Sequence, residues 1–438
     1  MRSMGVFGLQ KVNFVAFCFG AISTLFFCLL LFSAQNSTNK GVIQLRASQE
    51  YTRNSFWAPG VEIHKNLTET NIIRHGSKSD VLHFDEPIQT STSHPTERTT
   101  SVLGPTCPSP GQRNIVCIKV HKAASTTAVA ILERYGYKNN MTLAVKAETK
   151  YGPHILSSSQ QFKRNMVYQY QRKYNMLTNH VRYNRAEMDI VIPNATYLTI
   201  LRHPVKHFES AFVYFLVAKH LNLNGTDKIE AFFEKPDMYL SQKFYFWYQL
   251  QSGQIFDLGL DHHDHTGPKV AMLIQRLAEE FDLVMIADYF DESLVLLRKH
   301  LCLDWKDVVY IPDNFRTSGQ KLSISRELRQ KIEIWNWADM TLYRFFNHTF
   351  WNKVNDYGPT FKQDLAYFRK LLEDTRNECT TGKVIKKRRD AHGVRTIELR
   401  KNATEFCTNL MLGDTDYTKM FRNRQKETLY NRPQFWHN

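Results

Sequence analysis

The sequence lacks the glycine-rich phosphate loop G-x-x-x-x-G-K-[ST] that is typical of nucleoside-triphosphatases. It also shows no internal repeat, and its histidine- and aspartate-rich segment LDHHDHTG (260–267) matches no established metal-ligand spacing. These absences argue against an ordinary triphosphatase and against a bound metal. With 438 residues, of which 42% are hydrophobic and 13% aromatic, the chain can still build a large folded core.

Charge is absent between Lys11 and Lys40. Within this stretch, residues 12–33 are long enough to span a bilayer as a helix, which takes about 20 residues. They are too long for the apolar region of a signal peptide, and no small-x-small cleavage site follows them. The preceding tail, residues 1–11, carries Arg2 and Lys11 but no acid, which favours a cytoplasmic N terminus. The sequence therefore predicts a signal-anchor helix at 12–33 and a single-pass type II membrane protein.

Features beyond residue 33 also indicate a luminal chain. Seven N-x-[ST] glycosylation sequons follow the predicted anchor, at Asn36, Asn66, Asn140, Asn194, Asn224, Asn347 and Asn402. Cys117 lies in a predicted core strand and is expected to be a buried free thiol. Four further cysteines can form two disulfides in an oxidising lumen, with their pairing left open: Cys107, Cys302, Cys379 and Cys407.

Basic residues outnumber acidic ones, and the formal net charge is +15. Such a balance favours an anionic partner. Because a luminal compartment holds no nucleic acid partner, a nucleotide, an acidic glycan or a lipid headgroup is expected instead.

Residues 34–112 are predicted to form a largely disordered luminal stem. Their apolar residues are scattered, and eight of the twelve residues at 90–101 are serine or threonine. Such a segment buries too little apolar surface to offset the entropy of its chain. The folded domain is expected to span residues 113–438.

Residues 114–135 are predicted to form the centre of that domain. An apolar strand at 114–120 leads into a turn with Lys122 and then into a helix that begins at Ser125. A strand, turn and helix in this order direct backbone N–H groups and the helix dipole at one point, which suits a phosphate group. Lys122 adds a positive charge at that point. A plain basic turn, with Ser125 as an ordinary N-cap, is the alternative interpretation.

Two further segments carry candidate site residues. His180 lies in a short strand-like segment at 175–183, where a packed, hydrogen-bonded histidine is the more common role. A second strand, at 197–201, leads into Arg202 and a helix with Pro204 in its first turn and Ser210 further along. The carboxyl ends of such strands are where open α/β sheets bind ligands. A surface ion pair is the plainer role for Arg202.

The rest of the domain is predicted to be mainly helical. Helices are expected at 157–175, 226–251, 272–281, 290–301, 327–347 and 361–376, with another buried strand at 283–287. The many aromatic residues of 226–251 are expected to pack as core rather than to line a sugar site. The segment 314–319 is a candidate loop for closing over a nucleotide.

Four motifs in order and spacing resemble one family. They are CIKVHKAASTT (117–127), NHVRY (179–183), LRHPVKHFESAF (201–212) and FDESLVLL (290–297). The sequence resembles the galactose-3-O-sulfotransferases, the family that includes galactosylceramide sulfotransferase, from about residue 114 to about residue 378.

The resemblance implies an α/β, P-loop-like sulfotransferase fold with a central, mostly parallel sheet flanked by helices. It implies transfer of a sulfuryl group from 3′-phosphoadenosine 5′-phosphosulfate to the 3-hydroxyl of galactose, with no metal. Lys122 would act on the leaving group and His180 as the base. The donor would be bound by Lys122, Ala124, Ser125, Thr126, Thr127, Arg202 and Ser210, with Arg316 and Ser318 as weaker candidates. Two departures from the family pattern stand out: Ala123 replaces a threonine, and His203 replaces an aspartate or asparagine beside Arg202.

The resemblance also implies a Golgi membrane enzyme with a luminal catalytic domain. The acceptor would be a galactosyl glycolipid such as galactosylceramide or, alternatively, a galactose-terminated glycan of a glycoprotein. Two other functions fit the topology. A Golgi glycosyltransferase would need a metal-binding D-x-D motif, which occurs only at Asp414, Thr415 and Asp416. A galactoside-binding protein without turnover would leave the Lys122 turn without a purpose.

Overall fold

The computed structural model describes residues 113–146, 152, 154–169, 173–241, 246–313, 315, 322–386 and 395–430. The predicted cytoplasmic tail (1–11), transmembrane helix (12–33) and stem (34–112) lie outside the described residues, as do Arg316 and Ser318. Among the described helices, none combines the length and apolar character that crossing a bilayer requires.

A parallel sheet of four strands forms the centre of the folded unit. The strands are β1 (Ile115–Ile118), β2 (Met176–Leu177), β3 (Thr196–Leu201) and β4 (Leu283–Ile286), in the order β2-β1-β3-β4. β1 pairs with β3 from Ile115–Thr196 to Ile118–Thr199. All four strands are short apolar runs, and β1, β2 and β4 are buried throughout, as expected when helices cover both faces of a parallel sheet. The predicted α/β fold with a central parallel sheet flanked by helices is confirmed.

The strand order marks one edge of the sheet as the place for a ligand. β1 connects to β2 on one side through helix α2 (Ser125–Lys138), whereas β3 connects to β4 on the other side. Open α/β sheets bind ligands beyond the carboxyl ends of their strands, at the point where the strand order reverses. Here that point lies between the loops that follow β1 and β3.

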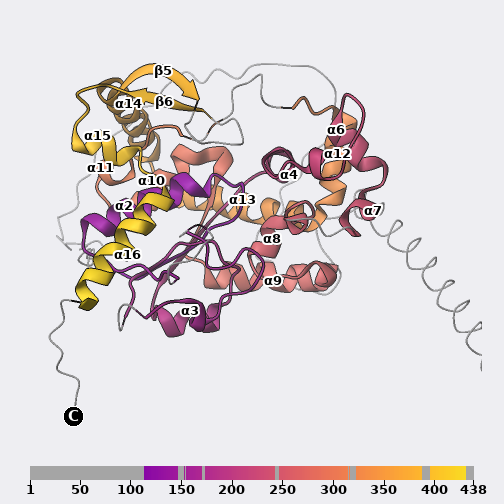
Figure 1. Ribbon diagram of the computed structural model, residues 1–438, viewed down its shortest axis with the longest axis horizontal. Helices are drawn as coiled ribbons and strands as arrows, with labels where there is room; N and C mark the ends of the chain where they lie inside the picture. Colours follow the sequence, from indigo (N-terminus) through magenta and orange to yellow (C-terminus); the bar gives the residue numbers. More distant parts are fainter. Residues whose placement is uncertain are drawn as a thin grey trace, which may run out of the picture. The chain divides into compact units, whose positions relative to one another are not determined.

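Helices surround the sheet (Figure 1). Those that follow β2 and β3 are α3 (Arg185–Val191), α4 (Pro204–Tyr214), α5 (Val217–His220), α6 (Lys228–Glu234), α7 (Pro236–Ser241), α8 (Gly253–Asp257) and α9 (Gly267–Glu280). Those that follow β4 are α10 (Phe290–His300), α11 (Trp305–Val308), α12 (Arg326–Trp335), α13 (Trp337–Tyr357) and α14 (Phe361–Cys379). The helices expected at 272–281, 290–301 and 361–376 correspond to α9, α10 and α14.

Three of the helix predictions need correction. In place of the single helix predicted at 226–251, the described residues form α6, α7 and a 3₁₀ turn at Trp247–Gln249. The helix predicted at 157–175 is wrong: the described part of this segment holds a single 3₁₀ turn at Arg164–Met166, and its backbone instead bridges residues 155 and 161 to residues 180 and 182. The helix predicted at 327–347 is two helices, α12 and α13. They are separated at Asn336, whose side-chain oxygen accepts a hydrogen bond from the Ser252 N–H group at 2.7 Å.

The aromatic segment 226–251 packs mainly as core. Phe232 is fully buried in a second apolar cluster together with Phe208, and Phe233 and Phe246 pack against that cluster. α6 and α7 cover part of this segment, and residues 242–245 lie outside the described residues. The preference for a core role over a sugar-lining role is therefore confirmed for these side chains.

The C-terminal part forms structure that the sequence did not predict. An antiparallel hairpin of β5 (Thr380–Lys386) and β6 (Arg395–Leu399) is followed by α15 (Glu405–Leu410) and α16 (Asp414–Tyr430). A disulfide joins Cys379 to Cys407, and Cys302 is disulfide-bonded as well. Cys117 is a buried free thiol, as predicted, and burial raises its pKa to about 12.

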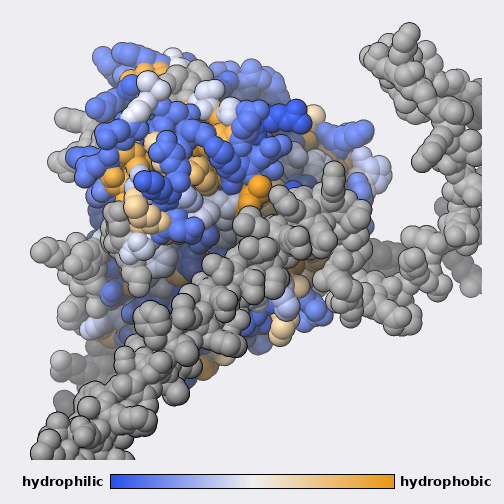
Figure 2. Space-filling model, turned by 90° about the vertical axis from the view of Figure 1, so that its right-hand side faces the viewer, coloured by the Kyte–Doolittle hydropathy of each residue, from blue (hydrophilic) through white to orange (hydrophobic). Residues whose placement is uncertain are grey.

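Figure 2 shows the side of the molecule that lies on the right in Figure 1. Most described residues on this face are hydrophilic, and the hydrophobic ones form small separate areas. Such a distribution is expected of a face in contact with water.

Candidate active site

The turn between β1 and α2 adopts a left-handed backbone without glycine. Lys122 has φ 54° and Ala124 has φ 61°, both in the region that most side chains avoid. Such conformations persist only where the surrounding structure holds them, and they gather at functional sites. Lys122 and Ala124 therefore provide the tight turn that a Walker A loop makes with glycines.

The hydroxyl-rich start of α2 is only partly available to a ligand. The Ser125 hydroxyl donates a hydrogen bond to the Val120 carbonyl at 2.6 Å, and this contact joins the two ends of the turn. Ala124, not Ser125, is the N-cap residue, and within the described chain no side chain caps this helix start. Ala124 is exposed, and Thr126 and Thr127 are half-buried in the first turn. The uncapped N–H groups and the two threonines are the groups that can meet an anion here.

Lys122 and Arg202 lie together at the strand reversal. Nη1 of Arg202 donates a hydrogen bond to the Lys122 carbonyl at 3.0 Å. The Lys122 ammonium lies 3.3 Å from the centroid of the Tyr214 ring, a cation–π contact that holds the side chain over α4. Ser210 is buried on the same helix. The structure thus brings together the predicted residues from the loops after β1 and β3.

The backbone of Arg202 is fixed by a glutamine. Gln254 of α8 accepts a hydrogen bond from the Arg202 N–H group and donates one to the Arg202 carbonyl, both at 2.8 Å. His203 is the N-cap of α4, and its N–H group donates to Asp288 at 2.8 Å. His203, which departs from the family pattern, therefore serves as the N-cap of α4, and Gln254 rather than residue 203 orients the backbone of Arg202.

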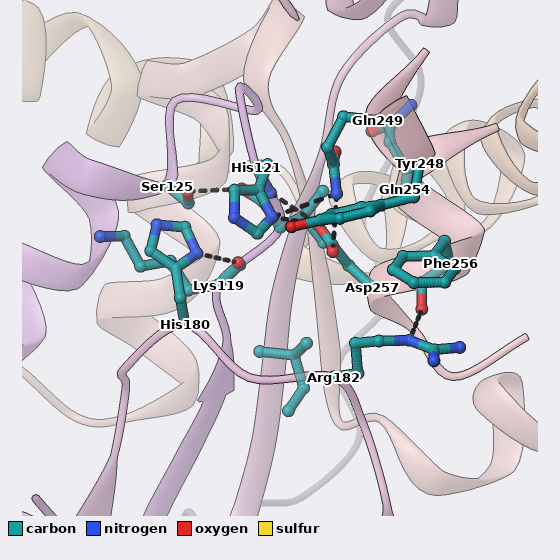
Figure 3. Close-up of polar contacts among 12 residues, drawn as sticks. Lys119, His121, Ser125, His180, Arg182, Tyr248, Gln249, Gln254, Phe256 and Asp257 are labelled. Carbon is teal, nitrogen blue, oxygen red and sulfur yellow. Dashed lines mark hydrogen bonds and ion pairs between the residues drawn. The ribbon is translucent and has the colours of Figure 1, made fainter. Parts of the chain in front are cut away.

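His180 follows β2, and its ring lies beside that of His121 in the turn after β1 (Figure 3). Its Nδ1 lies 3.0 Å from the Lys119 carbonyl oxygen. Since a carbonyl only accepts, Nδ1 carries the proton in this contact, and Nε2 is left with a lone pair. Burial, together with the charge of Lys119, lowers the pKa of His180 well below its usual value. His180 is therefore neutral near pH 7, as a general base must be.

His121 is a site residue that sequence reasoning missed. Its ring stacks on that of His180 with centroids 4.2 Å apart and planes 16° apart. Its Nδ1 and its backbone nitrogen each lie 2.8 Å from one carboxylate oxygen of Asp257. Gln249 donates to the other oxygen at 3.0 Å, as Figure 3 shows. A histidine held by a carboxylate in this way is the usual orientation of a general base.

The short helix α8 connects these groups. It carries both Gln254 and Asp257, which hold the loops after β3 and β1. Its N terminus donates two backbone hydrogen bonds to Asp339 of α13, from Gln254 at 3.1 Å and from Ile255 at 2.8 Å. Near its C terminus the Phe256 carbonyl accepts a hydrogen bond from Nε of Arg182 at 2.8 Å. The side chains of Asp339 and Arg182 thus pair backbone groups that a helix leaves without intrahelical partners at its two ends.

The two acidic motifs are engaged in other contacts. Asp414 forms a buried ion pair with Lys119, and Asp416 accepts a hydrogen bond from the Gly413 N–H group at 3.1 Å. Asp414 is thus unsuited to the metal-binding D-x-D motif of a glycosyltransferase.

In the histidine-rich segment, the ligand atoms of Asp261, His263 and Asp264 lie within 4.8 Å of one another. Asp261 pairs with Arg182 at 2.8 Å, and Asp264 pairs with Lys269. Both carboxylates therefore already have cationic partners. The expectation of no metal stays a prediction.

Comparison with known proteins gives one consistent family. The galactose-3-O-sulfotransferase family model matches residues 77–413. Galactosylceramide sulfotransferase of Bos taurus is 36% identical over 278 residues, which cover 62% of this chain and 65% of that protein. Galactose-3-O-sulfotransferase 3 of Bos taurus is 31% identical over 348 residues, 73% of this chain and 80% of that protein. Galactose-3-O-sulfotransferase 2 of Sus scrofa is 35% identical over 257 residues, 56% and 63% respectively. The chain thus spans just under two thirds of the galactosylceramide sulfotransferases it matches.

Proposed function

Because the chain belongs to the galactose-3-O-sulfotransferase family, we propose that it transfers a sulfuryl group from 3′-phosphoadenosine 5′-phosphosulfate to the 3-hydroxyl of a galactose residue. The observation that carries this proposal is that Lys122 and Arg202 lie together at the strand reversal. There Nη1 of Arg202 donates a hydrogen bond to the backbone carbonyl of Lys122 at 3.0 Å. Two cations fixed on neighbouring loops suit a nucleotide with phosphate groups at both its 3′ and 5′ positions.

The residues present fit such a donor. Lys122, Thr126, Thr127 and the N–H groups beginning at Ala124 would hold the 5′-phosphosulfate in a P-loop-like arrangement. Arg202 and Ser210 would hold the 3′-phosphate. Charge develops on the leaving phosphate oxygen during transfer, and a lysine fixed beside it stabilises that charge where it forms. Ser125, whose hydroxyl is bonded to Val120, would contribute through its backbone rather than through its side chain.

A base must take the proton of the acceptor hydroxyl, and two histidines are candidates. His180 has a lone pair on Nε2 and is held in that tautomer by the Lys119 carbonyl. His121 is held by Asp257, which stabilises the imidazolium that forms when the proton is taken. The two rings are stacked, so a hydroxyl that reaches one lies close to the other. We propose His180 as the base, with His121, which Asp257 orients, as the alternative.

The acceptor is proposed to be a galactosyl glycolipid such as galactosylceramide, with galactose-terminated glycoprotein glycans as the alternative. The relatives named for galactosylceramide reach 36% identity, against 35% for galactose-3-O-sulfotransferase 2 and 31% for galactose-3-O-sulfotransferase 3. We further propose that residues 12–33 anchor the protein in the Golgi membrane as a type II protein, with its catalytic domain in the lumen. No metal is expected in the reaction.

The direct test offers the purified full-length protein ³⁵S-labelled donor with galactosylceramide, lactosylceramide or N-acetyllactosamine, with and without EDTA. Sulfation of a galactoside that resists EDTA is expected. Incorporation of sugar from labelled sugar nucleotides instead, or loss of activity in EDTA, would contradict the proposal.

Lys122→Ala is expected to reduce sulfation by at least a hundredfold while the protein stays folded, because the leaving group loses its fixed cation. Lys219→Ala, which removes an exposed lysine of α5, is the matched control and should match the unmodified protein. Substantial turnover in Lys122→Ala would refute the role of Lys122.

A further inference from the structure

Helix α16 contacts the residues that surround the site, beginning with Lys119. It lies just beyond the family match, which ends at residue 413. It packs alongside α2, the helix that follows the Lys122 turn (Figure 1). Gln425 bonds both the N–H and the carbonyl of Leu143, at 2.7 and 3.1 Å. Arg424 donates to the Met141 carbonyl at 2.6 Å. These contacts fix the helix in register against the folded core.

The first residue of α16 supplies the counter-charge of a buried lysine. The side chains of Lys119 and Asp414 are 2% and 7% exposed and form an ion pair. Although burial opposes ionisation, Lys119 holds the pKa of Asp414 below its usual value. Glu133 of α2 is fully buried nearby, and burial followed by the charge of Asp414 raises its pKa well above the usual range. Asp414 is therefore the anion that balances Lys119, whereas the surroundings of Glu133 favour its neutral form.

This pair reaches His180 through Lys119, whose carbonyl accepts a hydrogen bond from His180 Nδ1 at 3.0 Å. The next residue of α16, Thr415, bonds Nδ1 of His154 at 2.9 Å. The ring of His154 stands edge-on to that of His180, with centroids 6.0 Å apart. Two consecutive residues of α16 thus hold two neighbours of His180.

We propose that Asp414 is a positioning residue of the site: by pairing with Lys119 it keeps His180 in the tautomer with Nε2 unprotonated and balances the positive charge beside it. This inference rests on the proposed role of His180 for its effect on turnover. Its effect on the His180 imidazole does not depend on that role.

The charged and titratable groups that face His180 come from three segments: Lys119 follows β1, His121 lies in the turn before α2, and His154 lies in the segment before the 3₁₀ turn. Asp414, at the start of α16, faces two of these groups, Lys119 and His154. Lys119, His121 and His154 each disfavour the imidazolium. Asp414 acts in the opposite direction, because it offsets the charge of Lys119.

Two variants should therefore move the pKa of His180 in opposite directions. In Asp414→Asn the Lys119 ammonium has no counter-ion, so the imidazolium becomes less favourable and the pKa falls. In the double variant Lys119→Met/Asp414→Asn the ammonium is gone, so the pKa rises above that of the unmodified protein. The double variant leaves no unpaired buried charge and should fold even if Asp414→Asn does not. Asp414→Glu should behave like the unmodified protein.

The pKa of each histidine can be measured on the full-length protein in detergent by exchange of the imidazole C2 hydrogen, read by mass spectrometry of the His180 peptide. Opposite shifts in the two variants support the inference. The same His180 pKa in all variants would overturn it, even if no sulfation were detected at all. Asp416→Asn, two residues further along α16 and exposed, is the matched control and should shift nothing.

Steady-state kinetics of sulfation provide the second test of the proposal. Asp414→Asn should lower kcat for sulfation by about tenfold, a part of what a positioned base contributes. The apparent KM for the donor should change less than twofold, because the donor-binding loops are untouched. The acid limb of its pH–rate profile should move to lower pH, since a weaker base stays unprotonated in more acid solution. A loss that appears only in KM would count against a positioning role.

Discussion

Replacing Asp339 should change how the stability of the protein depends on pH. Asp339 is fully buried on α13 and accepts hydrogen bonds from two N–H groups of α8. Burial nevertheless raises its pKa from the ordinary 3.8 to about 7. The neutral form is therefore favoured in the folded protein, and ionisation near neutral pH opposes folding.

The size of the effect follows from the two pKa values. The rise from 3.8 to about 7 corresponds to about 4 kcal/mol, because one pKa unit is worth about 1.4 kcal/mol. Since the folded pKa is the higher one, this contribution to stability is complete below about pH 4 and is lost as the pH rises to about 7. Asp339→Asn cannot ionise, but it leaves one N–H group of α8 without an acceptor, which costs about 1–3 kcal/mol at every pH.

The assay compares urea unfolding of the two proteins from pH 5 to pH 8. At pH 5 the unmodified protein has already lost about 1.4 of the roughly 4 kcal/mol, so the two proteins should be close in unfolding free energy. From pH 5 to about pH 7 the unmodified protein should lose a further ~1.4 kcal/mol per pH unit, so that Asp339→Asn becomes the more stable protein. Above about pH 7 the difference should stay constant. Asp356→Asn, at an exposed position on the same helix, should show no such trend. If the unfolding free energy of Asp339→Asn does not rise relative to that of the unmodified protein between pH 5 and pH 7, Asp339 is ionised throughout, and the argument from its burial is wrong.

Three further substitutions probe the site and the fold. Arg202→Ala should raise the donor KM at least tenfold in initial-rate measurements. Arg202→Lys should restore only part of this binding, because an ammonium lacks the guanidinium fork. If His121 is the base, Asp257→Asn should lower kcat by roughly a hundredfold. A loss of kcat in His180→Ala that Asp257→Asn does not match would instead assign the base to His180. Cys407→Ser should lower the free energy of unfolding by about 3–4 kcal/mol, since the disulfide closes a loop of 28 residues. Denaturant unfolding of the variant measures this, and an unchanged midpoint would show that the hairpin region is held by packing alone.

The parts of the fold that the sequence predicted are those that local signals determine. The apolar run before His121 and the one before Arg202 predicted β1 and β3, because a short buried strand leaves a compact pattern in the sequence. The basic turn and the proline after these strands marked the starts of α2 and α4. Because all four strands are parallel, their carboxyl ends lie on one edge of the sheet, and Lys122 and Arg202 meet there. Local patterns and one topological rule were sufficient for this half of the site.

The wrong helix at 157–175 shows where local signals fail. Phe162 and Met166 occur at helical spacing, and Phe162 is fully buried as a core residue should be. The chain nevertheless runs extended beside residues 180–182, where the Phe162 N–H group donates to the Arg182 carbonyl at 2.9 Å. Arg182 in turn donates to the Ser159 carbonyl at 3.2 Å. Such contacts with the segment after β2 satisfy the backbone without a helix, and they override a weak helical preference.

The carboxylates of the site were beyond sequence reasoning for a related reason. Asp257 lies 136 residues from His121, and Asp414 lies 295 residues from Lys119. Each contact needs the position of a whole helix, α8 or α16, and no sequence pattern in either helix points to its partner in β1 or the turn after it. Asp414 stood in a D-x-D pattern that suggested a metal, whereas the structure gives it a buried lysine as partner. The same carboxyl group is a metal ligand when exposed beside other acids and a counter-ion when buried beside an ammonium. Its surroundings in the fold, rather than its sequence neighbours, therefore decide its chemistry.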